Sequence, residues 1–310
     1  MQVEKELGKL SAKKDMLLTI GVFDGVHLGH KYLISQLKGL ARKQGLASGV
    51  VTFRQHPQEV LSPQTRLPFL TDLAQRTKLL KDEGVETIII LSFTRELASF
   101  SPRQFLGLLK KYLRMRGLVI GPDFALGQSR EGNTDTLRRL GQEMGFSVTV
   151  VPPIIINGEM VSSTAIRKAL ALGDMKRVQS FIGRPFRLHG QVIAGARRGM
   201  ELGFPTANLA LSPQQALPAE GVYASRAYID GEAHPAMTNI GQRPTFGESQ
   251  RVVEVYLLDY HGDLYGQQLA VDIIERLRSE IKFDTPEQLK KQIAKDVKQG
   301  KAILKTRGES

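Results

Sequence analysis

The chain has 310 residues, 41% hydrophobic and 24% charged, which is typical of a soluble globular protein and long enough for two domains. It contains no cysteine, which excludes disulfides, thiolate zinc sites and cysteine nucleophiles. The net charge is +12, and residues 1–183 carry most of it, with 26 Lys and Arg against 16 Asp and Glu, or +10. Such a basic segment favours anionic partners, either nucleic acid or phosphorylated small molecules, unless it is only a solvated surface.

No apolar run approaches the roughly 20 residues that a membrane helix needs. The N-terminal segment MQVEKELGKLSAKKD is polar and lacks the apolar centre of a secretory signal. We therefore expect no membrane association and a cytoplasmic location.

Residues 1–183 alternate apolar runs with amphipathic stretches. The apolar runs, which predict strands, are 16–23, 47–53, 85–91, 117–121 and 146–152. The amphipathic stretches, which predict helices, are 31–45, 70–84, 101–116, 134–145 and 163–183. Ser101, Pro102 and Gln104 have the pattern of a capping box with a first-turn proline. Strands separated by helices predict a doubly wound α/β domain with a parallel sheet, Rossmann-like, over residues 1–183.

Residues 184–310 have a different pattern. The strand-like runs, several of them bounded by glycine turns, are 187–196, 221–230, 233–241, 251–260 and 267–277. Because no helices separate these runs, they predict an antiparallel sandwich or barrel. One helix follows, with Thr285 as N-cap, Pro286 in the first turn and Gln288 as the capping-box residue. We expect a second domain over residues 184–310.

The first chemical motif, GVFDGVHLGH over residues 21–30, follows the first predicted strand. In an open α/β sheet, ligands bind beyond the carboxyl ends of the strands, where helix N-termini offer free N–H groups. His27 and His30 could donate hydrogen bonds to phosphoryl oxygens, and Gly29 would leave room for a phosphate. Two histidines one turn apart also suit zinc, although no HExxH-type glutamate accompanies them, and a purely structural turn is the third alternative.

A second motif, VSSTAIRKAL, places Ser163 and Thr164 at a helix start with Arg167 one turn later. This arrangement suits a second phosphate site, although alone it is equally an ordinary N-cap with an exposed arginine. Together, HLGH and SSTAIR resemble the HxGH and (S/T)xxxR signatures of the nucleotidyltransferase superfamily. The resemblance implies adenylyl transfer from ATP by positioning and charge stabilisation, with Mg²⁺ and without a covalent enzyme intermediate.

The third motif lies in the second half, where GARRGMELGFPTANLAL joins a basic glycine-rich loop to PTAN. Thr206 and Asn208 offer oxygen ligands that suit Mg²⁺. Glu254, within VVEVY, could act as a general base, although strand periodicity leaves its facing open. An exposed strand glutamate and an ordinary turn are the plainer alternatives. With NIGQRPTF and VEVYLLDYHGDLYG, these segments resemble the flavokinase family, a compact antiparallel barrel that phosphorylates riboflavin.

Over nearly all its length the chain thus resembles the bacterial bifunctional riboflavin kinase/FAD synthetase family. The family implies Mg²⁺ as cofactor, with ATP, riboflavin and FMN as small-molecule substrates and FAD as product. Its pattern implies Glu254, His27 and His30 as catalytic residues, and Thr206 and Asn208 as Mg²⁺ ligands. The ATP and phosphate contacts it implies are Gly21, Phe23, Asp24, Gly29, Asp123, Ser163, Thr164, Arg167, Gly195, Arg198, Gly203, Pro205, Thr206 and Asn208. The positions on the flavin side are Asn239, Arg243, Arg278 and Phe283.

One segment departs from the family. The loop that usually reads DFxFGxxxxGD is DFALGQSREGN here, with Leu126 and Asn133 at the variant places. Losing an aromatic ring and a carboxylate is expected to alter ATP or flavin affinity in the first site.

A regulatory protein that binds nucleic acid or flavin and a zinc-dependent hydrolase are the rival functions. The absence of tryptophan and the aromatic content of 6% argue against a stacking platform for single strands, so no nucleic-acid partner is expected.

Overall fold

The computed structural model describes residues 1–10, 12–62, 64, 67–195, 198–243 and 250–307. The chain divides into two compact units, Met1–Ser163 and Thr164–Ser310. The sequence analysis placed the domain boundary later in the chain, at 183/184. In the structure, the segment 164–183 groups with the second unit. As a limit between functional domains, 183/184 stays a prediction.

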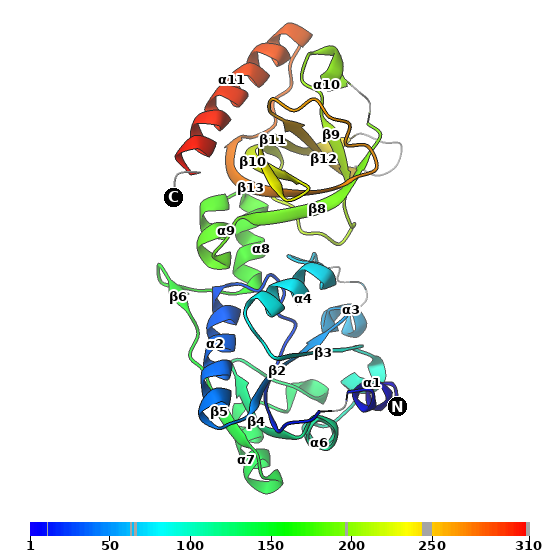
Figure 1. Cartoon of the computed structure of the whole chain (residues 1–310), viewed down its shortest axis with the longest axis vertical. Helices are drawn as coiled ribbons and strands as arrows, with labels where there is room; N and C mark the ends of the chain where they lie inside the picture. The colour runs from blue at the N-terminus through cyan, green and yellow to red at the C-terminus, as the bar shows by residue number, and fades with distance from the viewer. Residues whose placement is uncertain (11, 63, 65–66, 196–197, 244–249, 308–310) are drawn as a thin grey trace. The chain divides into compact units, whose positions relative to one another are not determined.

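The first unit is built on a five-stranded parallel sheet (Figure 1). Its strands are β1 (Met16–Ile20), β2 (Ala47–Phe53), β3 (Thr87–Leu91), β4 (Met115–Ile120) and β5 (Ser147–Val150). The strand order is β3-β2-β1-β4-β5. Every residue of β1 and β2 is buried, as expected for a parallel sheet covered on both faces. The predicted α/β architecture is confirmed.

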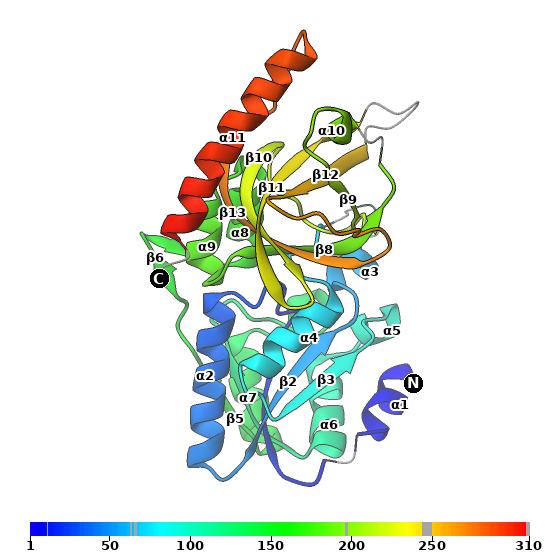
Figure 2. The same cartoon turned by 45° about the horizontal axis from the view of Figure 1, so that its top comes forward.

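Helices cover both faces of this sheet (Figure 2). They are α1 (Gln2–Gly8), α2 (Leu28–Lys43), α3 (Pro57–Leu61), α4 (Leu73–Asp82), α5 (Arg95–Ala98), α6 (Pro102–Leu113) and α7 (Thr134–Met144). The apolar residues of α2 and α4 pack with Leu17 and Val50 on one face, while those of α1, α6 and α7 pack with Leu18 and Val51 on the other. A 3₁₀ turn (Gln128–Arg130) and a small hairpin of β6 (Ile155–Ile156) and β7 (Glu159–Met160) complete the unit.

The helix starts follow their capping residues. The capping box of Ser101 and Gln104 is present at α6. Helix α2 begins at Leu28, earlier than the predicted start at residue 31, because the His27 side chain is its N-cap. The preceding strand also ends earlier than predicted, at Ile20, which leaves residues 21–27 as a turn.

The second unit is a closed six-stranded barrel, which confirms the predicted antiparallel architecture. Its strands are β8 (Phe186–Ile193), β9 (Ala207–Ala210), β10 (Gly221–Ile229), β11 (Glu232–Arg243), β12 (Gln250–Leu257) and β13 (Gln268–Arg278). The order around the barrel is β10-β11-β12-β9-β8-β13. Its helices are α8 (Ser163–Leu172), α9 (Met175–Ile182), α10 (Arg198–Glu201) and the predicted terminal helix α11 (Pro286–Thr306).

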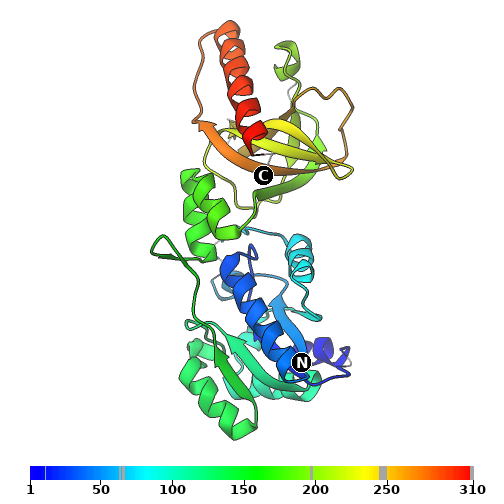
Figure 3. The ribbon, with the colours of Figure 1, turned by 60° about the vertical axis from the view of Figure 1, so that its left-hand side comes forward.

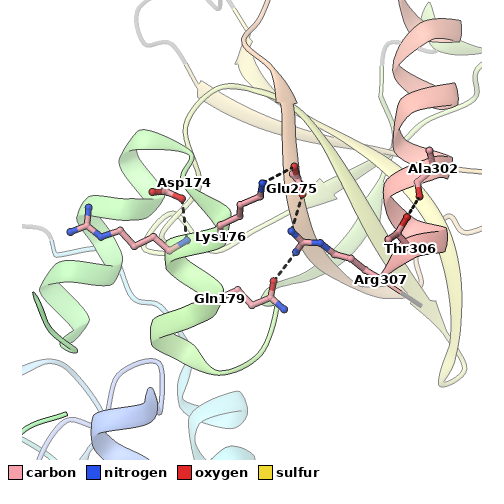
Figure 4. Close-up of polar contacts among 8 residues, drawn as sticks. Asp174, Lys176, Gln179, Glu275, Ala302, Thr306 and Arg307 are labelled. Carbon is pink, nitrogen blue, oxygen red and sulfur yellow. Dashed lines mark hydrogen bonds and ion pairs between the residues drawn. The ribbon is translucent and has the colours of Figure 1, made fainter. Parts of the chain in front are cut away.

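Helix α11 runs along the outside of the barrel against β10, β11 and β13 (Figure 3). Thr285 caps it by accepting the N–H of Gln288, as predicted, but the Gln288 side chain accepts the N–H of Asp284 instead of closing a capping box. After the helix, Arg307 donates to Gln179 of α9 and to Glu275 of β13, and Lys176 pairs with Glu275 (Figure 4).

Among the described helices, none combines the length and apolar character that crossing a bilayer requires.

Candidate active sites

The turn 21–27 lies at the point where the strand order of the first sheet reverses. It follows the carboxyl end of β1, which has β2 on one side and β4 on the other. Connections from neighbouring strands leave in opposite directions at such a point and open a crevice for ligands. The topology therefore places His27 and His30 where a doubly wound fold binds nucleotides.

The backbone of this turn is strained. Phe23 and Val26, neither of them glycine, have φ angles of 55° and 38°. A β-branched residue with positive φ is costly, and such conformations persist only where neighbours enforce them. The turn is thus held in an unfavourable conformation immediately before the two histidines.

Asp24 and Thr71 enforce the strained turn. The Asp24 carboxylate accepts the backbone N–H groups of Leu70 and Thr71 at 3.0 Å, and Thr71 Oγ1 accepts the N–H of Gly25 at 2.9 Å. Ser163 Oγ donates to the Asp24 carbonyl at 2.9 Å. Asp24 and Thr71 are both 2% exposed, so these bonds are shielded from water. The Asp24 carboxylate thus binds neighbouring backbone, and the Ser163 hydroxyl fixes the turn. Contact of either residue with ATP stays a prediction.

The N-cap bond fixes the tautomer of His27. Its Nδ1 accepts the backbone N–H of His30 at 3.3 Å, so the ring proton of the neutral imidazole lies on Nε2. The two imidazole rings are stacked, with centroids 3.6 Å apart and an interplanar angle of 18°. Phe23 packs against His30 with ring centroids at 5.0 Å. The turn thus holds a paired set of imidazoles.

His30 is neutral at physiological pH. Burial, then the neighbouring His27 and Arg76, hold the pKa of His30 well below its usual 6.5. Its Nδ1 is buried and makes no hydrogen bond in the described structure. The imidazole is therefore suited to act as a neutral hydrogen-bond partner of phosphate oxygens.

Gly29 has a packing role that the sequence did not show. A Cβ at this position would lie 3.2 Å from the His27 ring and from the Val161 carbonyl oxygen. Glycine thus makes room for the His27 ring. Clearance for a phosphate stays a prediction.

The zinc alternative lacks a ligand set. Within the residues that the structure describes, no group of three histidine, aspartate or glutamate side chains is arranged to hold a metal ion. Zinc requires three or four such ligands.

The departing loop keeps its local structure. Asn133 Oδ1 accepts the N–H of Thr136 at 3.0 Å and caps α7, a role that Asn fills as well as Asp. Leu126 packs against the apolar core. Asp123 is exposed, and its carbonyl accepts from Arg130. Any change in nucleotide or flavin affinity stays a prediction.

In the barrel, the strand register places three predicted site residues in one row. Asn208 of β9 is directly opposite Glu254 of β12, and Glu254 is directly opposite Asn239 of β11. Directly opposed residues of antiparallel strands project from the same face. An amide, a carboxylate and a second amide therefore lie side by side on three neighbouring strands.

The burial pattern of β12 settles the facing of Glu254. Val253 and Val255 are buried in the barrel core at 2% and 0% exposure, so Glu254 projects from the opposite face with Val252 and Tyr256. It is half-buried. The carboxylate is thus partly accessible beside Asn208.

Gly195 makes this row possible. A Cβ at Gly195 would lie 2.0 Å from Asn208 Nδ2, so only glycine leaves space for the amide. Asn208 is itself 7% exposed. The amide oxygen of Asn208 and the Thr206 hydroxyl are hard oxygen donors, the ligand type that Mg²⁺ prefers.

The predicted flavin-side residues have structural partners. Arg278 pairs with Asp296 of α11 at 2.8 Å, and its guanidinium lies 5.9 Å from the Phe283 ring centroid. Burial and then Glu220 raise the pKa of Glu280, whose carboxylate accepts from Asn239. Glu280, which the sequence motifs did not indicate, therefore lies next to the row of Asn208, Glu254 and Asn239.

Comparisons with known proteins assign the two halves of the chain to two different families. The FAD synthetase family model matches residues 9–165, and the riboflavin kinase family model matches residues 182–304. A bifunctional riboflavin kinase/FMN adenylyltransferase from Pseudomonas fluorescens is 37% identical over 306 residues, 98% of each chain. Enzymes of the same name from Escherichia coli K12 and Bacillus subtilis are 38% and 35% identical, each covering 90% of both chains.

The chain belongs to the bifunctional riboflavin kinase/FMN adenylyltransferase family. A crystal structure described as a macrolide-efflux protein from Streptococcus pneumoniae has the same fold, with a TM-score of 0.88, 31% identity and 96% coverage of each chain. The HLGH turn lies within the FAD synthetase match, and the row of Asn208, Glu254 and Asn239 lies within the riboflavin kinase match.

The remaining predicted residues of this family member lie in several elements, and their roles stay predictions. In the first unit, Gly21 directly follows β1. Thr164, exposed, and Arg167, half-buried, lie on α8 in the second unit. In the loop before β9, Gly203, Pro205 and Thr206 are exposed. Arg198 and Arg243 are described in backbone only, in α10 and at the end of β11, and Arg197 lies outside the described residues.

Sequence reasoning missed Arg76 and Thr71 beside the first site. Arg76 follows Leu73 by three residues and precedes Leu80 by four, so it lies on the apolar stripe of α4. A charged residue on an apolar stripe is the signal that could have revealed it.

Proposed function

We propose that the two sites divide the family's two reactions between the units of this chain. At the barrel, ATP phosphorylates riboflavin to give FMN and ADP. At the HLGH turn, the AMP group of a second ATP is transferred to FMN, giving FAD and diphosphate. The observation that carries this assignment is the presence of two separate polar sites, each within the match of a different family model.

In the kinase reaction, Glu254 acts as the general base. Its half-buried carboxylate takes the proton from the terminal hydroxyl of the ribityl chain as that oxygen attacks the γ-phosphorus of ATP. Asn208 and Thr206 would hold Mg²⁺, which neutralises phosphate charge when bound. Asn239 lies opposite Glu254 on the neighbouring strand, and its side chain hydrogen-bonds to the carboxylate of Glu280.

In the adenylyl transfer, His27 and His30 stabilise the departing diphosphate. An FMN phosphate oxygen attacks the α-phosphorus of ATP, and negative charge grows on the oxygen of the leaving group. The Nε2–H of His27, oriented by the N-cap bond, donates to this oxygen. The hydrogen bonds of Asp24 and Thr71 hold the strained turn and thereby keep the His27 ring in position.

The direct experiment is incubation of the purified protein with riboflavin, ATP and Mg²⁺, followed by chromatography of the flavins. We expect FMN and then FAD, and FAD alone when FMN is the starting flavin. Absence of both products would refute the assignment. FMN without FAD would locate the failure in the first unit, at the loop that carries Leu126 and Asn133.

A further inference from the structure

The hairpin of β6 and β7 carries an Asn-Gly pair at its tip (Figure 1). Of the four asparagines in the chain, only Asn157 is followed by glycine. Asn157 and Gly158 are the two residues of the turn, between the paired residues Ile156 and Glu159. Their φ angles are 51° and 78°, as the tight turn of a two-residue hairpin loop requires. The fold thus presents this pair at the end of a short two-stranded element.

The side-chain amide of Asn157 and the backbone nitrogen of Gly158 are open to reaction. Both residues are exposed. Neither the Asn157 side chain nor the Gly158 N–H makes a hydrogen bond to the described part of the chain. Apart from its two chain neighbours, no residue has an atom within 4 Å of the position that a Cβ would take at Gly158. Water therefore reaches both groups.

An asparagine followed by glycine cyclises without an enzyme. The backbone nitrogen of Gly158 loses its proton and attacks Cγ of Asn157, so that a new N–C bond forms and the side-chain amide nitrogen leaves as ammonia. Water then opens the five-membered imide at either of its two carbonyls and gives aspartate or isoaspartate. Glycine favours the attack because it has no Cβ to obstruct the approach and because its backbone is permissive.

The small size of the hairpin lets the turn reach the geometry of attack. The hairpin has two residue pairs, Ile155 with Met160 and Ile156 with Glu159. A two-stranded hairpin is marginally stable by itself, so its turn opens more readily than the strands of a sheet. The Asp230-Gly231 turn has the same signs of φ, but nine pairs of β10 and β11 hold it, and an aspartate must lose water instead of ammonia. Asn157 is therefore the more reactive of the two.

The hairpin leads directly into contacts with the HLGH turn. At its base, the N–H of Val161 donates to the carbonyl of Ile154 at 2.9 Å. Val161 is 5% exposed, and its carbonyl oxygen lies 3.2 Å from the position that a Cβ would take at Gly29. Two residues later, Ser163 Oγ donates to the Asp24 carbonyl. Closure of the hairpin therefore helps to set the position of the segment that packs against the HLGH turn.

We propose that Asn157 is a site of spontaneous modification, and that isoaspartate formed there slows adenylyl transfer. Isoaspartate adds one carbon atom to the main chain, so the loop no longer closes in the register that pairs Ile156 with Glu159. The segment with Val161 and Ser163 is then no longer held against the HLGH turn. The effect on FAD synthesis rests on the proposed function of that turn, whereas the modification itself does not.

Ageing of the intact protein tests the modification. Wild type would be incubated above and below neutral pH, and peptide mass spectrometry with an enzymatic isoaspartate assay would quantify the product at each asparagine. We expect product at Asn157 first, and faster at the higher pH because the attacking nitrogen must lose a proton. Asn133, which is exposed but followed by threonine, is the internal control and should stay unmodified over the same period. Equal modification of Asn133, or none of Asn157, would overturn the proposal.

Rates measured on the same samples test the consequence. FAD synthesis from FMN should fall in direct proportion to the isoaspartate fraction, while riboflavin phosphorylation, carried by the barrel, is unchanged. Asn157→Gly removes the amide and accepts positive φ, so it should start at the wild-type rate and keep that rate during ageing. Asn157→Asp should also start at the wild-type rate, which separates the effect of a new charge from that of the altered main chain.

The outcomes separate the modification from the proposed function. Full FAD synthesis by modified wild type would overturn the link to the HLGH turn. Immediate loss of FAD synthesis in Asn157→Asp would assign the effect to charge and overturn the role of isoaspartate. If freshly purified wild type makes no FAD, the proposed function fails, and the mass measurement still decides the modification. If Asn157→Gly does not fold, the relation between isoaspartate fraction and rate in the wild type carries the test.

Discussion

Glu254 is the residue on which the kinase proposal depends. As the proposed general base, its carboxylate has a role that an amide cannot fill. We predict that Glu254→Gln lowers FMN formation by about 10²–10⁴-fold while FAD synthesis from added FMN is retained. Both rates follow from chromatography of the flavins. The matched control is Glu232→Gln at the exposed start of β11, which should leave both reactions unchanged.

His27 is the residue on which the proposal for adenylyl transfer in the first unit depends. Removing its Nε2–H donor by His27→Ala should reduce FAD synthesis from FMN by about 10²–10³-fold, the usual effect of losing one oxyanion donor. The loss should appear in kcat, because the charge on the leaving oxygen develops only in the transition state. A rise in KM with unchanged kcat would instead assign His27 to ground-state binding.

The half-buried His30 also predicts how stability depends on pH. Its folded-state pKa lies well below 6.5, so below pH 6.5 the unfolded chain binds a proton that the folded chain does not. This contribution to stability is complete above pH 6.5 and is lost as the pH falls from 6.5 towards the folded-state pKa. Urea unfolding should show a larger loss between pH 8 and 5.5 for the wild type than for His30→Gln. Equal losses would contradict the burial of a neutral imidazole.

Sequence reasoning located single residues where a motif kept them together. His27 and Glu254 could be proposed from the sequence because their motifs are short and continuous. Thr71 and Arg76 could not, because they reach the turn from residues more than forty positions away. The bonds from the Asp24 carboxylate to the backbone of Leu70 and Thr71 could not be predicted, because only the folded chain brings these residues together. Contact of Asp24 with ATP stays a prediction.

At the scale of elements, the segment before α4 holds the turn after β1. Thr71→Val keeps the shape of the side chain but leaves the buried Gly25 N–H without this acceptor. We expect the first unit to lose about 1–3 kcal/mol of unfolding free energy and FAD synthesis to fall, with kinase activity unchanged. Thr71→Ser keeps the hydroxyl and should behave as the wild type. Equal FAD synthesis by the valine and serine variants would show that this contact does not hold the site.

Helix α11 is joined to the barrel by a buried ion pair. Asp296 is 5% exposed and Arg278 17% exposed. Asp296→Ala leaves the guanidinium without this carboxylate, and denaturant unfolding should show a loss of about 3–5 kcal/mol. The double variant Arg278→Met with Asp296→Leu should recover most of it. If the double variant is less stable than the single one, the account of this pair is wrong.

Elements with clear local signals were predicted, and elements defined by tertiary contacts were not. The strand over 47–53 and the capped start of α6 match the structure because burial and capping follow directly from the residues. Strand β9 was missed because its four residues gain strand structure only by pairing with β8 and β12. Helix α1 was missed because its polar segment buries only Val3 and Leu7.

At the scale of the whole molecule, two units of different architecture each carry their own polar site. The change of periodicity between the halves predicted both architectures, because parallel and antiparallel sheets impose different spacing of apolar runs. The position of the division was less predictable. The segment 164–183 continues the helical pattern of the first half but groups structurally with the barrel, where Arg307 and Ala219 contact it.

The separation of the two sites is the central claim, and one set of rates tests it. Wild type, Glu254→Gln and His27→Ala would each be given riboflavin with ATP and, separately, FMN with ATP. We predict that Glu254→Gln makes FAD from FMN but no FMN from riboflavin, and that His27→Ala makes FMN from riboflavin but little FAD. Loss of both reactions in either variant, with the fold intact by circular dichroism, would contradict the two-site account.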